Sequence, residues 1–437
     1  MDLGTGGVAG RRFWRAALGA ALCAAVCLGC GGEGEAGEPG PSGGGGGASG
    51  GGGAGGGGGA AGGAGGRPGG ASGGGGAGAS GGSAGASGGS AGASGGSAGA
   101  SGGGGGASGG GAGAGASGGA QQGVWSSATE LAAKPMSGDA WLELLKFADA
   151  DTSNPNVSDQ DDPTNVRVLA AAIAYARSGD VKYKAKVDTA CVQVQGSEKG
   201  GRTLAWGREL GAYAMAADLV GYSSPAFSTW LKNVTDVEKG SELNITLRQM
   251  FYKRPNNWGS MAFGSLTAVY RYLGDDVLLK DVRDYWAQGV TGKNPGLVYG
   301  ADVSWHVDPN DLRLINPKGA MKQGVNIDGI IPDDMRRGGP FTTGTPAGTG
   351  YPWEHLQGVP MAARVRGRAG MPIWGVDASA TWRSSSPLQE RIGGTFLCSG
   401  DDLWQLAFLD QAYARNWSGS QNVWRAGKNA GFAYVLP

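Results

Sequence analysis

Polar side chains that could bind an anion gather in two segments, the first of which is Arg254-Pro255-Asn256-Asn257-Trp258. It stands directly before an apolar stretch with helical spacing. The backbone N–H groups of a helix N-terminus, joined by the two Asn amides, favour an anion such as a carboxylate. Asn256 is also a typical helix cap, which is the alternative interpretation of that residue. The segment predicts a helix start at which an anion can bind.

The second segment combines carboxylates and arginines with a tyrosine and a histidine. It contains Asp333, Asp334, Arg336 and Arg337, followed after a Thr/Gly/Pro loop by Tyr351, Trp353, Glu354 and His355. Arginine binds carboxylates through two parallel hydrogen bonds, so this segment also suits an acidic ligand. We expect the acids to orient the neighbouring arginines.

Helices must position these groups, because apolar residues recur at three-to-four spacing from Asp139 onward. The helices are expected over 140–147, 166–176, 181–194, 204–220, 225–234, 243–252, 258–273, 277–286, 353–369 and 401–415. Strand-like alternation is scarce. The pattern predicts an all-α domain of antiparallel helical hairpins, arranged as a bundle, solenoid or toroid. The polar stretch 291–350 breaks this rhythm, and loops of that length are usually functional.

The N-terminal residues are typical of an export signal. Three arginines at positions 11, 12 and 15 precede the apolar run 16–28, which is too short to span a bilayer. Gly29 and Cys30 follow the run, and this ending resembles a bacterial lipoprotein signal. We expect residues 1–29 to be a signal peptide, with a lipid on Cys30 and an anchor in the outer membrane. Ordinary secretion or an uncleaved anchor are the alternatives.

A Gly/Ser/Ala-rich segment, 30–123, separates this signal from the remainder. It contains more than half of the 92 Gly residues of the chain and no aromatic residue, so it cannot bury enough apolar surface to fold. We expect a disordered linker and a single catalytic domain over 124–437. The net charge is zero, which excludes a general attraction to nucleic acid. We expect a monomer.

The expected domain contains two cysteines, Cys191 and Cys398, which could form a disulfide or stay as separate buried thiols. The two His are far apart in the sequence, and the cysteines are not clustered. This spacing predicts no transition-metal site, and we expect no cofactor.

The order of the motifs resembles the alginate lyase family of polysaccharide lyases, whose fold is an incomplete (α/α) toroid. The resemblance rests on the Asn pair before a helix, on Asp-Gly-x-x-Pro-x-x-x-x-Arg-Gly from Asp328, and on Tyr351 before another helix. Weaker support comes from 159–163, 174–177, 202–208 and 427–431. The resemblance spans nearly the whole domain. It implies that the protein cleaves a uronic-acid polysaccharide, alginate above all, by β-elimination.

The resemblance also implies roles for particular residues. Asn257 and Arg337 would neutralise the uronate carboxylate, and Tyr351 would transfer the proton. Many members have His where this chain has Trp258, so His355, one turn after Tyr351, could supply the imidazole. The groups expected to bind or orient substrate are Arg254, Asn256, Trp258, His306, Arg336, Trp353 and Glu354.

Two alternatives remain open. A sugar-binding surface protein that has lost activity would explain Trp258 in place of His. A glycoside hydrolase would use Asp333, Asp334 or Glu354 as its acid and base, and it requires two of these carboxylates to face each other across a cleft.

Overall fold

The computed structural model of the chain describes residues 123–292, 296–342, 349–371, 398, 400–419 and 422–436. The predicted signal peptide, the acylation site at Cys30 and the linker up to residue 122 lie outside the described residues. Contacts between Cα atoms group residues 108–437 as one unit.

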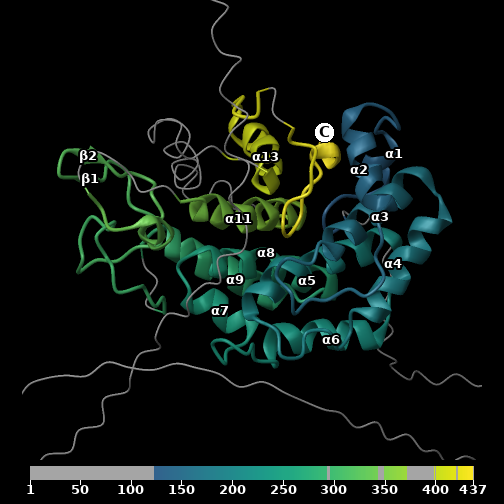
Figure 1. Cartoon of the computed structure of the whole chain (residues 1–437), viewed down its shortest axis with the longest axis horizontal. Helices are drawn as coiled ribbons and strands as arrows, with labels where there is room; N and C mark the ends of the chain where they lie inside the picture. The colour runs from purple at the N-terminus through teal and green to yellow at the C-terminus, as the bar shows by residue number, and fades with distance from the viewer. Residues whose placement is uncertain are drawn as a thin grey trace, which may run out of the picture. The chain divides into compact units, whose positions relative to one another are not determined.

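Helices make up most of the described chain (Figure 1), in agreement with the all-α prediction. The α-helices are α1 (Ala128–Ala132), α2 (Asp139–Asp149), α3 (Thr164–Ser178), α4 (Val181–Gln193), α5 (Thr203–Val220), α6 (Pro225–Asp236), α7 (Leu247–Lys253), α8 (Asn257–Leu273), α9 (Asp276–Val290), α10 (Pro332–Met335), α11 (Tyr351–Arg368) and α13 (Trp404–Tyr413). Short 3₁₀ turns are η1 (Arg336–Gly338), η2 (Gly400–Asp402) and η3 (Ala433–Val435). The strands within the described residues, β1 (Met321–Lys322) and β2 (Val325–Asn326), form one antiparallel hairpin.

Local capping decides where the helices begin. Asn256 caps α8, because its side chain accepts a hydrogen bond from the backbone N–H of Trp258. The helix expected over 243–252 begins later, at Leu247, because Thr246 and Gln249 form a capping box at that point. The expected helix 401–415 is likewise divided into η2 and α13.

Helices α3, α5, α8 and α11 pack one against the next in that order, while α4 packs on α3 and α9 on α8. Figure 1 shows α11 between α8 and α13. Glycines allow the closest approaches, since a Cβ on Gly207 of α5 would lie 3.1 Å from the backbone N of Ala262. A Cβ on Gly358 of α11 would overlap the carbonyl oxygen of Ser260. Ser265 joins α8 to α5 by accepting from Gly211 N and donating to Gly207 O. These contacts fix α8 between α5 and α11.

The stretch 291–350, expected as a long polar loop, has structure of its own. It contains β1, β2, α10 and η1 in its described part. Its apolar side chains form a second core cluster, which includes Trp305, Ile327, Ile330 and Met335. This cluster holds the segment against the start of α11, where Trp353 joins it.

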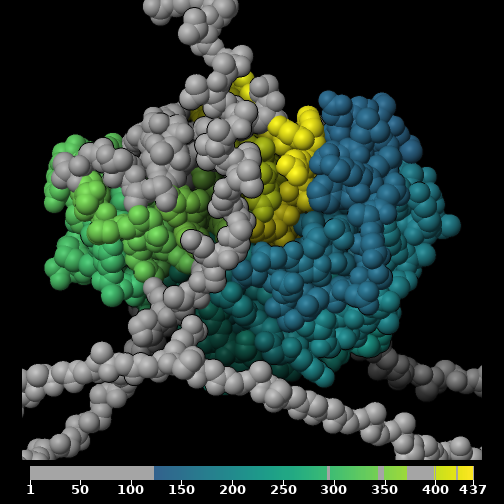
Figure 2. All heavy atoms as spheres, viewed as in Figure 1, coloured from purple at the N-terminus to yellow at the C-terminus, as the bar shows by residue number. Residues whose placement is uncertain are grey.

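The C-terminal residues pack back onto the helices. Figure 2 shows them in yellow beside the blue residues of α1 and α2. Tyr434 lies against Trp141 with 5.4 Å between ring centroids, and its hydroxyl donates to Pro135 O. No helix of the described residues is long and apolar enough to cross a membrane. Cys191 and Cys398 are both buried free thiols, so the separate-thiol interpretation holds and the disulfide is absent.

Candidate active site

Glu354, in the first turn of α11, is the centre of a cluster of hydrogen-bond donors. Its Oε2 accepts from the guanidinium of Arg208 at 2.8 Å and from Asn257 Nδ2 at 3.1 Å. Its Oε1 accepts from Lys428 Nζ at 2.7 Å. Burial alone would raise the pKa of Glu354, but the charges of Arg208 and Lys428 outweigh it and hold the pKa at about 2. Glu354 is therefore ionised at neutral pH. We call Glu354, Arg208, Asn257 and Lys428 the glutamate cluster.

Three parts of the chain bring the glutamate cluster together. Arg208 comes from α5 and Asn257 from the first position of α8. Lys428 comes from the C-terminal loop, whose position is fixed by Gln357 of α11: the side-chain oxygen of Gln357 accepts from Lys428 N at 3.0 Å. Asn165 of α3 donates to Lys428 O at 2.8 Å. The cluster thus lies where α3, α5, α8 and α11 meet the C-terminal loop.

The two aspartates of α10 fix the N-terminus of α8. Asp333 accepts from Asn256 Nδ2 at 3.0 Å and from Arg336 Nε at 2.8 Å. Asp334 accepts from Asn257 N at 3.0 Å. Both aspartates are buried, so the expectation that they orient an arginine is confirmed for the Asp333–Arg336 pair. Asn256 serves as a cap and as a donor to Asp333.

Arg337 and Tyr351 lie together, as the motifs predict. The guanidinium carbon of Arg337 is 3.7 Å from the centroid of the Tyr351 ring. A cation this close to the ring is an electrostatically favourable arrangement. Tyr351 begins α11 and stands three residues before Glu354, so both lie on one face of the first helical turn. Tyr351 and Arg337 are each partly exposed.

Trp258 is covered by two arginines. The guanidinium carbons of Arg202 and Arg254 lie 5.4 Å and 5.8 Å from its ring. Arg202 also forms a two-point ion pair with Glu242, at 2.8 Å and 2.9 Å. Trp258 is itself buried, so Arg254 and Arg202 rather than the indole meet the solvent on this side.

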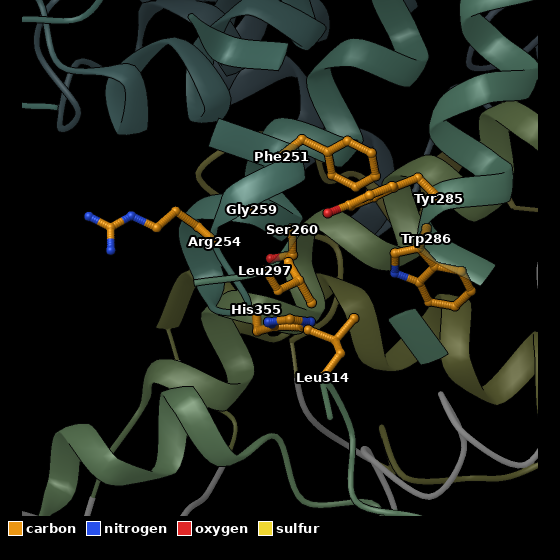
Figure 3. A pocket seen from close by; sticks show the side chains of 9 residues that line it. All are labelled: Phe251, Arg254, Gly259, Ser260, Tyr285, Trp286, Leu297, Leu314 and His355. Atoms are coloured by element: carbon orange, nitrogen blue, oxygen red, sulfur yellow. The ribbon is translucent and has the colours of Figure 1, made fainter. Parts of the chain in front are cut away.

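His355 lies inside the protein, whereas Tyr351 is partly exposed. Its Nδ1 is 2.9 Å from Asp334 Oδ2, and the residue is 3% exposed. Figure 3 shows its ring below Ser260 and beside Leu314, in a small cavity of about 20 Å³ that is lined mainly by apolar and aromatic groups. Burial raises the pKa of Asp334, and the approach of His355 lowers it. The expectation that His355 faces the cleft is therefore corrected: it helps to hold Asp334.

Two further expected residues are core residues. Trp353 is 1% exposed and belongs to the second core cluster, so it cannot form the wall of a sugar subsite. His306 is also buried, and its ring meets Tyr299 edge to face at 5.1 Å. Burial lowers the pKa of His306 to about 4 and keeps the ring neutral. Both expectations of substrate contact are corrected, because the stretch 291–350 folds over these side chains.

Sequence reasoning assigned no role to Arg208, Lys428 or Asp402. Arg208 and Lys428 lie within the motifs that carry the resemblance, so their positive charge was the feature of the sequence that could have identified them as site residues. Asp402 accepts from Gln357 Nε2 at 2.7 Å. Burial and the neighbouring Asp401 raise its pKa to about 8, and Glu354 adds to this effect. An ionised Glu354 and a protonated Asp402 thus occur in the same region.

Comparisons with known proteins leave the site to be judged on its chemistry. No protein-family model matches the chain, and no curated protein matches its sequence. Among the described residues, no group of three or more His, Cys, Asp or Glu is arranged to hold a metal ion.

Proposed function

We propose that the protein is an exported polysaccharide lyase that cleaves a uronic-acid-containing polysaccharide by β-elimination. The observation that carries the proposal is the Arg337–Tyr351 contact beside the glutamate cluster. It joins a phenol, a possible proton carrier, to a site rich in guanidinium and ammonium groups. Arg208, Arg337 and Lys428 supply three positive charges, against the negative charges of Glu354 and of Asp161, which lies 3.8 Å from Arg208. The excess suits an anionic sugar.

The arrangement suggests a division of labour. Arg337 binds the carboxylate of the uronate and stabilises the charge that develops on it when the adjacent C5 proton leaves. The Tyr351 phenolate takes that proton. The C5–H electron pair forms the C4–C5 double bond, the C4–O4 bond breaks, and Tyr351 returns its proton to O4. The products are an unsaturated uronate, which becomes the new non-reducing end, and a fragment whose new reducing end carries the protonated O4 as its anomeric hydroxyl group, so atoms and electrons balance.

Asn257 acts differently from the role that the resemblance implies. Its amide N–H group is directed to Glu354, so in this arrangement it positions Glu354. Glu354 in turn holds Arg208 and Lys428 in place. We propose that Asn257 and Glu354 are positioning residues, while Arg337 and Tyr351 meet the substrate.

The helix packing is compatible with the family to which the motifs point. In an (α/α) toroid, alternate helices form an inner layer and the helices between them an outer layer. The contact order α3–α5–α8–α11, with α4 and α9 on other faces, has this alternation. We propose an incomplete (α/α) toroid on this basis, with alginate among the substrates to be tested. Attachment to the outer membrane through Cys30 is part of the same proposal, and it rests on the sequence of residues 11–30 alone.

A hydrolase is the second candidate, because of Asp402. Asp333 and Asp334 are buried and hold the N-terminus of α8, whereas Asp402 is partly exposed and is better placed to serve as the acid that this reaction needs. Asp402, with its pKa near 8, is protonated at neutral pH, and Glu354 is ionised. Paired carboxyl groups with pKa values that differ in this way are typical of an acid and its base or nucleophile. A hydrolase would therefore use Asp402 and Glu354 in place of the pair first expected.

Ultraviolet absorbance of the C4–C5 double bond, followed with the full-length protein, tests the proposal. The substrates are mannuronan, guluronan, glucuronan and a glycosaminoglycan. We expect absorbance to rise on at least one polymer. Tyr351→Phe should lower kcat by at least about 100-fold, the usual contribution of a general acid or base. Tyr222→Phe, just beyond the opposite end of α5 from Arg208, is the matched control and should keep full activity.

Three results would count against the lyase. New reducing ends without absorbance, abolished by Asp402→Asn, would establish the hydrolase. Binding of a polymer without any cleavage would favour the sugar-binding protein. Full activity of Tyr351→Phe would remove Tyr351 from the mechanism.

A further inference from the structure

A cavity of about 250 Å³ adjoins the glutamate cluster. It lies between the loop 160–163, helices α3 and α5, and the C-terminal loop 425–428. Lys428 belongs both to the cavity lining and to the glutamate cluster. Arg208 lies 3.8 Å from Asp161, which lines the cavity. The cavity and the glutamate cluster are therefore neighbours with a shared wall.

Acidic groups dominate the cavity lining: Asp161, Asp162, Glu209 and Asp401. The cations of its described lining, Lys428 and Arg425, are directed to acids outside it. Lys428 contacts Glu354 at 2.7 Å, and Arg425 contacts Glu143 at 3.6 Å. The cavity therefore disfavours a second uronate.

Glu209 is the feature that points to a ligand. It lines the cavity from α5 and is 1% exposed, yet its Oε2 has no hydrogen-bond partner among the described residues. A buried carboxyl oxygen without a partner is costly, and native proteins generally satisfy such groups. Burial raises the pKa of Glu209, and the nearby charge of Asp162 raises it further. A cationic donor in the cavity would satisfy the free oxygen and favour the ionised form.

We propose that this cavity is a subsite for a hexosamine residue with a free, protonated amine, next to the uronate in the chain. The ammonium group would donate to Glu209 and Asp161. The volume lies below the range typical of drug-sized ligands, which suits one sugar ring. The side chain of Phe147 provides an apolar wall for a sugar face. A bare metal ion fits less well, since the described acids are not arranged as metal ligands.

The inference rests on the proposed function and narrows its substrate. A uronate at the basic site followed by an amino sugar at the acidic cavity defines a mixed polysaccharide. A homopolymer of uronates such as alginate would place a carboxylate against Asp161 and Glu209. We therefore expect mixed polymers with free amines to be better substrates than mannuronan or guluronan.

Calorimetric titration of the full-length protein with two trisaccharides tests the cavity independently of catalysis. One probe consists of glucosamine and the other of N-acetylglucosamine, which has the same ring but no charge. We expect the amine form to bind at least about tenfold more tightly, as one charge-assisted hydrogen bond provides. Asp161→Asn and Glu209→Gln should each remove most of this preference. Asp276→Asn, at the exposed start of α9, makes the same charge change away from the cavity lining and should keep it.

Equal binding of the two trisaccharides would overturn the inference, as would a preference that survives both cavity variants. The cleavage assay separates this failure from failure of the proposed function. Unsaturated products from homopolymers and mixed polymers at equal rates would leave the lyase standing and remove the amino-sugar subsite. An amine preference without unsaturated product from any polymer would keep the subsite and refute the lyase.

Discussion

Replacing Glu354 by Gln tests whether the glutamate cluster is held together by charge. The substitution keeps the shape of the side chain but removes its negative charge. Arg208, whose side chain is 5% exposed, would then be a buried cation with a neutral neighbour. We expect the variant to be less stable than the wild type at neutral pH. It should still bind anionic polysaccharide, but the arginines that make the contact should be less well ordered.

The pKa of Glu354 sets the size of the effect. A folded-state pKa of about 2, against an ordinary value of 4.5, is a difference of about 2.5 units. At about 1.4 kcal/mol per unit, this corresponds to between about 3 and 4 kcal/mol of stability at pH 7. Because the folded pKa is lowered, this stability is complete above the unfolded pKa and is lost as the pH falls from about 4.5 through about 2. By about pH 3, less than half of it remains.

Urea unfolding followed by Trp fluorescence measures this difference at a series of pH values. The free energy of unfolding of Glu354→Gln is subtracted from that of the wild type. The subtraction removes the contributions of the other titrating groups, because both proteins contain them. Glu238→Gln, an exposed substitution in the turn after α6, should show no difference at any pH. A wild-type advantage that is equal at pH 7 and pH 3 would refute the electrostatic reasoning, because it would arise from a contribution that does not titrate.

Three further predictions concern the fold. Gly358→Ala should destabilise the protein by about 3 kcal/mol or prevent folding, because the new methyl group overlaps Ser260 O. Gly367→Ala in the same helix places its methyl group at least 4 Å from any neighbouring segment and should stabilise the protein by up to about 1 kcal/mol. Thermal unfolding compares the two variants. Burial lowers the pKa of His306 to about 4 from its ordinary value of 6.5. The free energy of unfolding of the wild type should therefore fall by up to about 3 kcal/mol as the pH drops from 6.5 to 4, and that of His306→Gln by clearly less. Equal losses for the two proteins in urea unfolding would contradict this prediction. The Cys191 thiol should react with a thiol reagent only after unfolding, because burial raises its pKa to about 12 and covers the sulfur. Prompt reaction of the native protein would contradict this and show that the site opens.

Much of the helical architecture could be predicted from residue order because its causes are local. Apolar spacing placed α3, α4, α5 and α8 to within a few residues. Capping set the remaining boundaries, and Thr246 shifted the start of α7 because a capping box outweighed the weak apolar signal of residues 243–245. The pairing of Arg337 with Tyr351 and of Asp333 with Arg336 also followed from motifs, since each pair is close in the sequence or adjoins a helix start.

The burial of individual side chains could not be predicted in this way. His306, Trp353 and His355 carry chemistry suited to a sugar site, yet all three are buried by contacts between segments far apart in the chain. Stretch 291–350 appears polar, but its few large apolar residues meet those of α11 and α13 and form a separate core. Such contacts depend on chain topology, which periodicity does not encode.

Sequence by itself determined which chemical groups this protein has and where most of its helices lie, and it predicted that residues 30–123 have too few apolar side chains to form a core. Only the tertiary structure decided which charges meet. It brought Lys428 from the C-terminal loop and Arg208 from α5 to Glu354, and it left one oxygen of Glu209 without a hydrogen-bond partner among the described residues, in a cavity with several acidic groups. The physical reason is that electrostatic and hydrogen-bonding energies depend on separations of a few ångströms, and the packing of α5, α8 and α11 sets those separations.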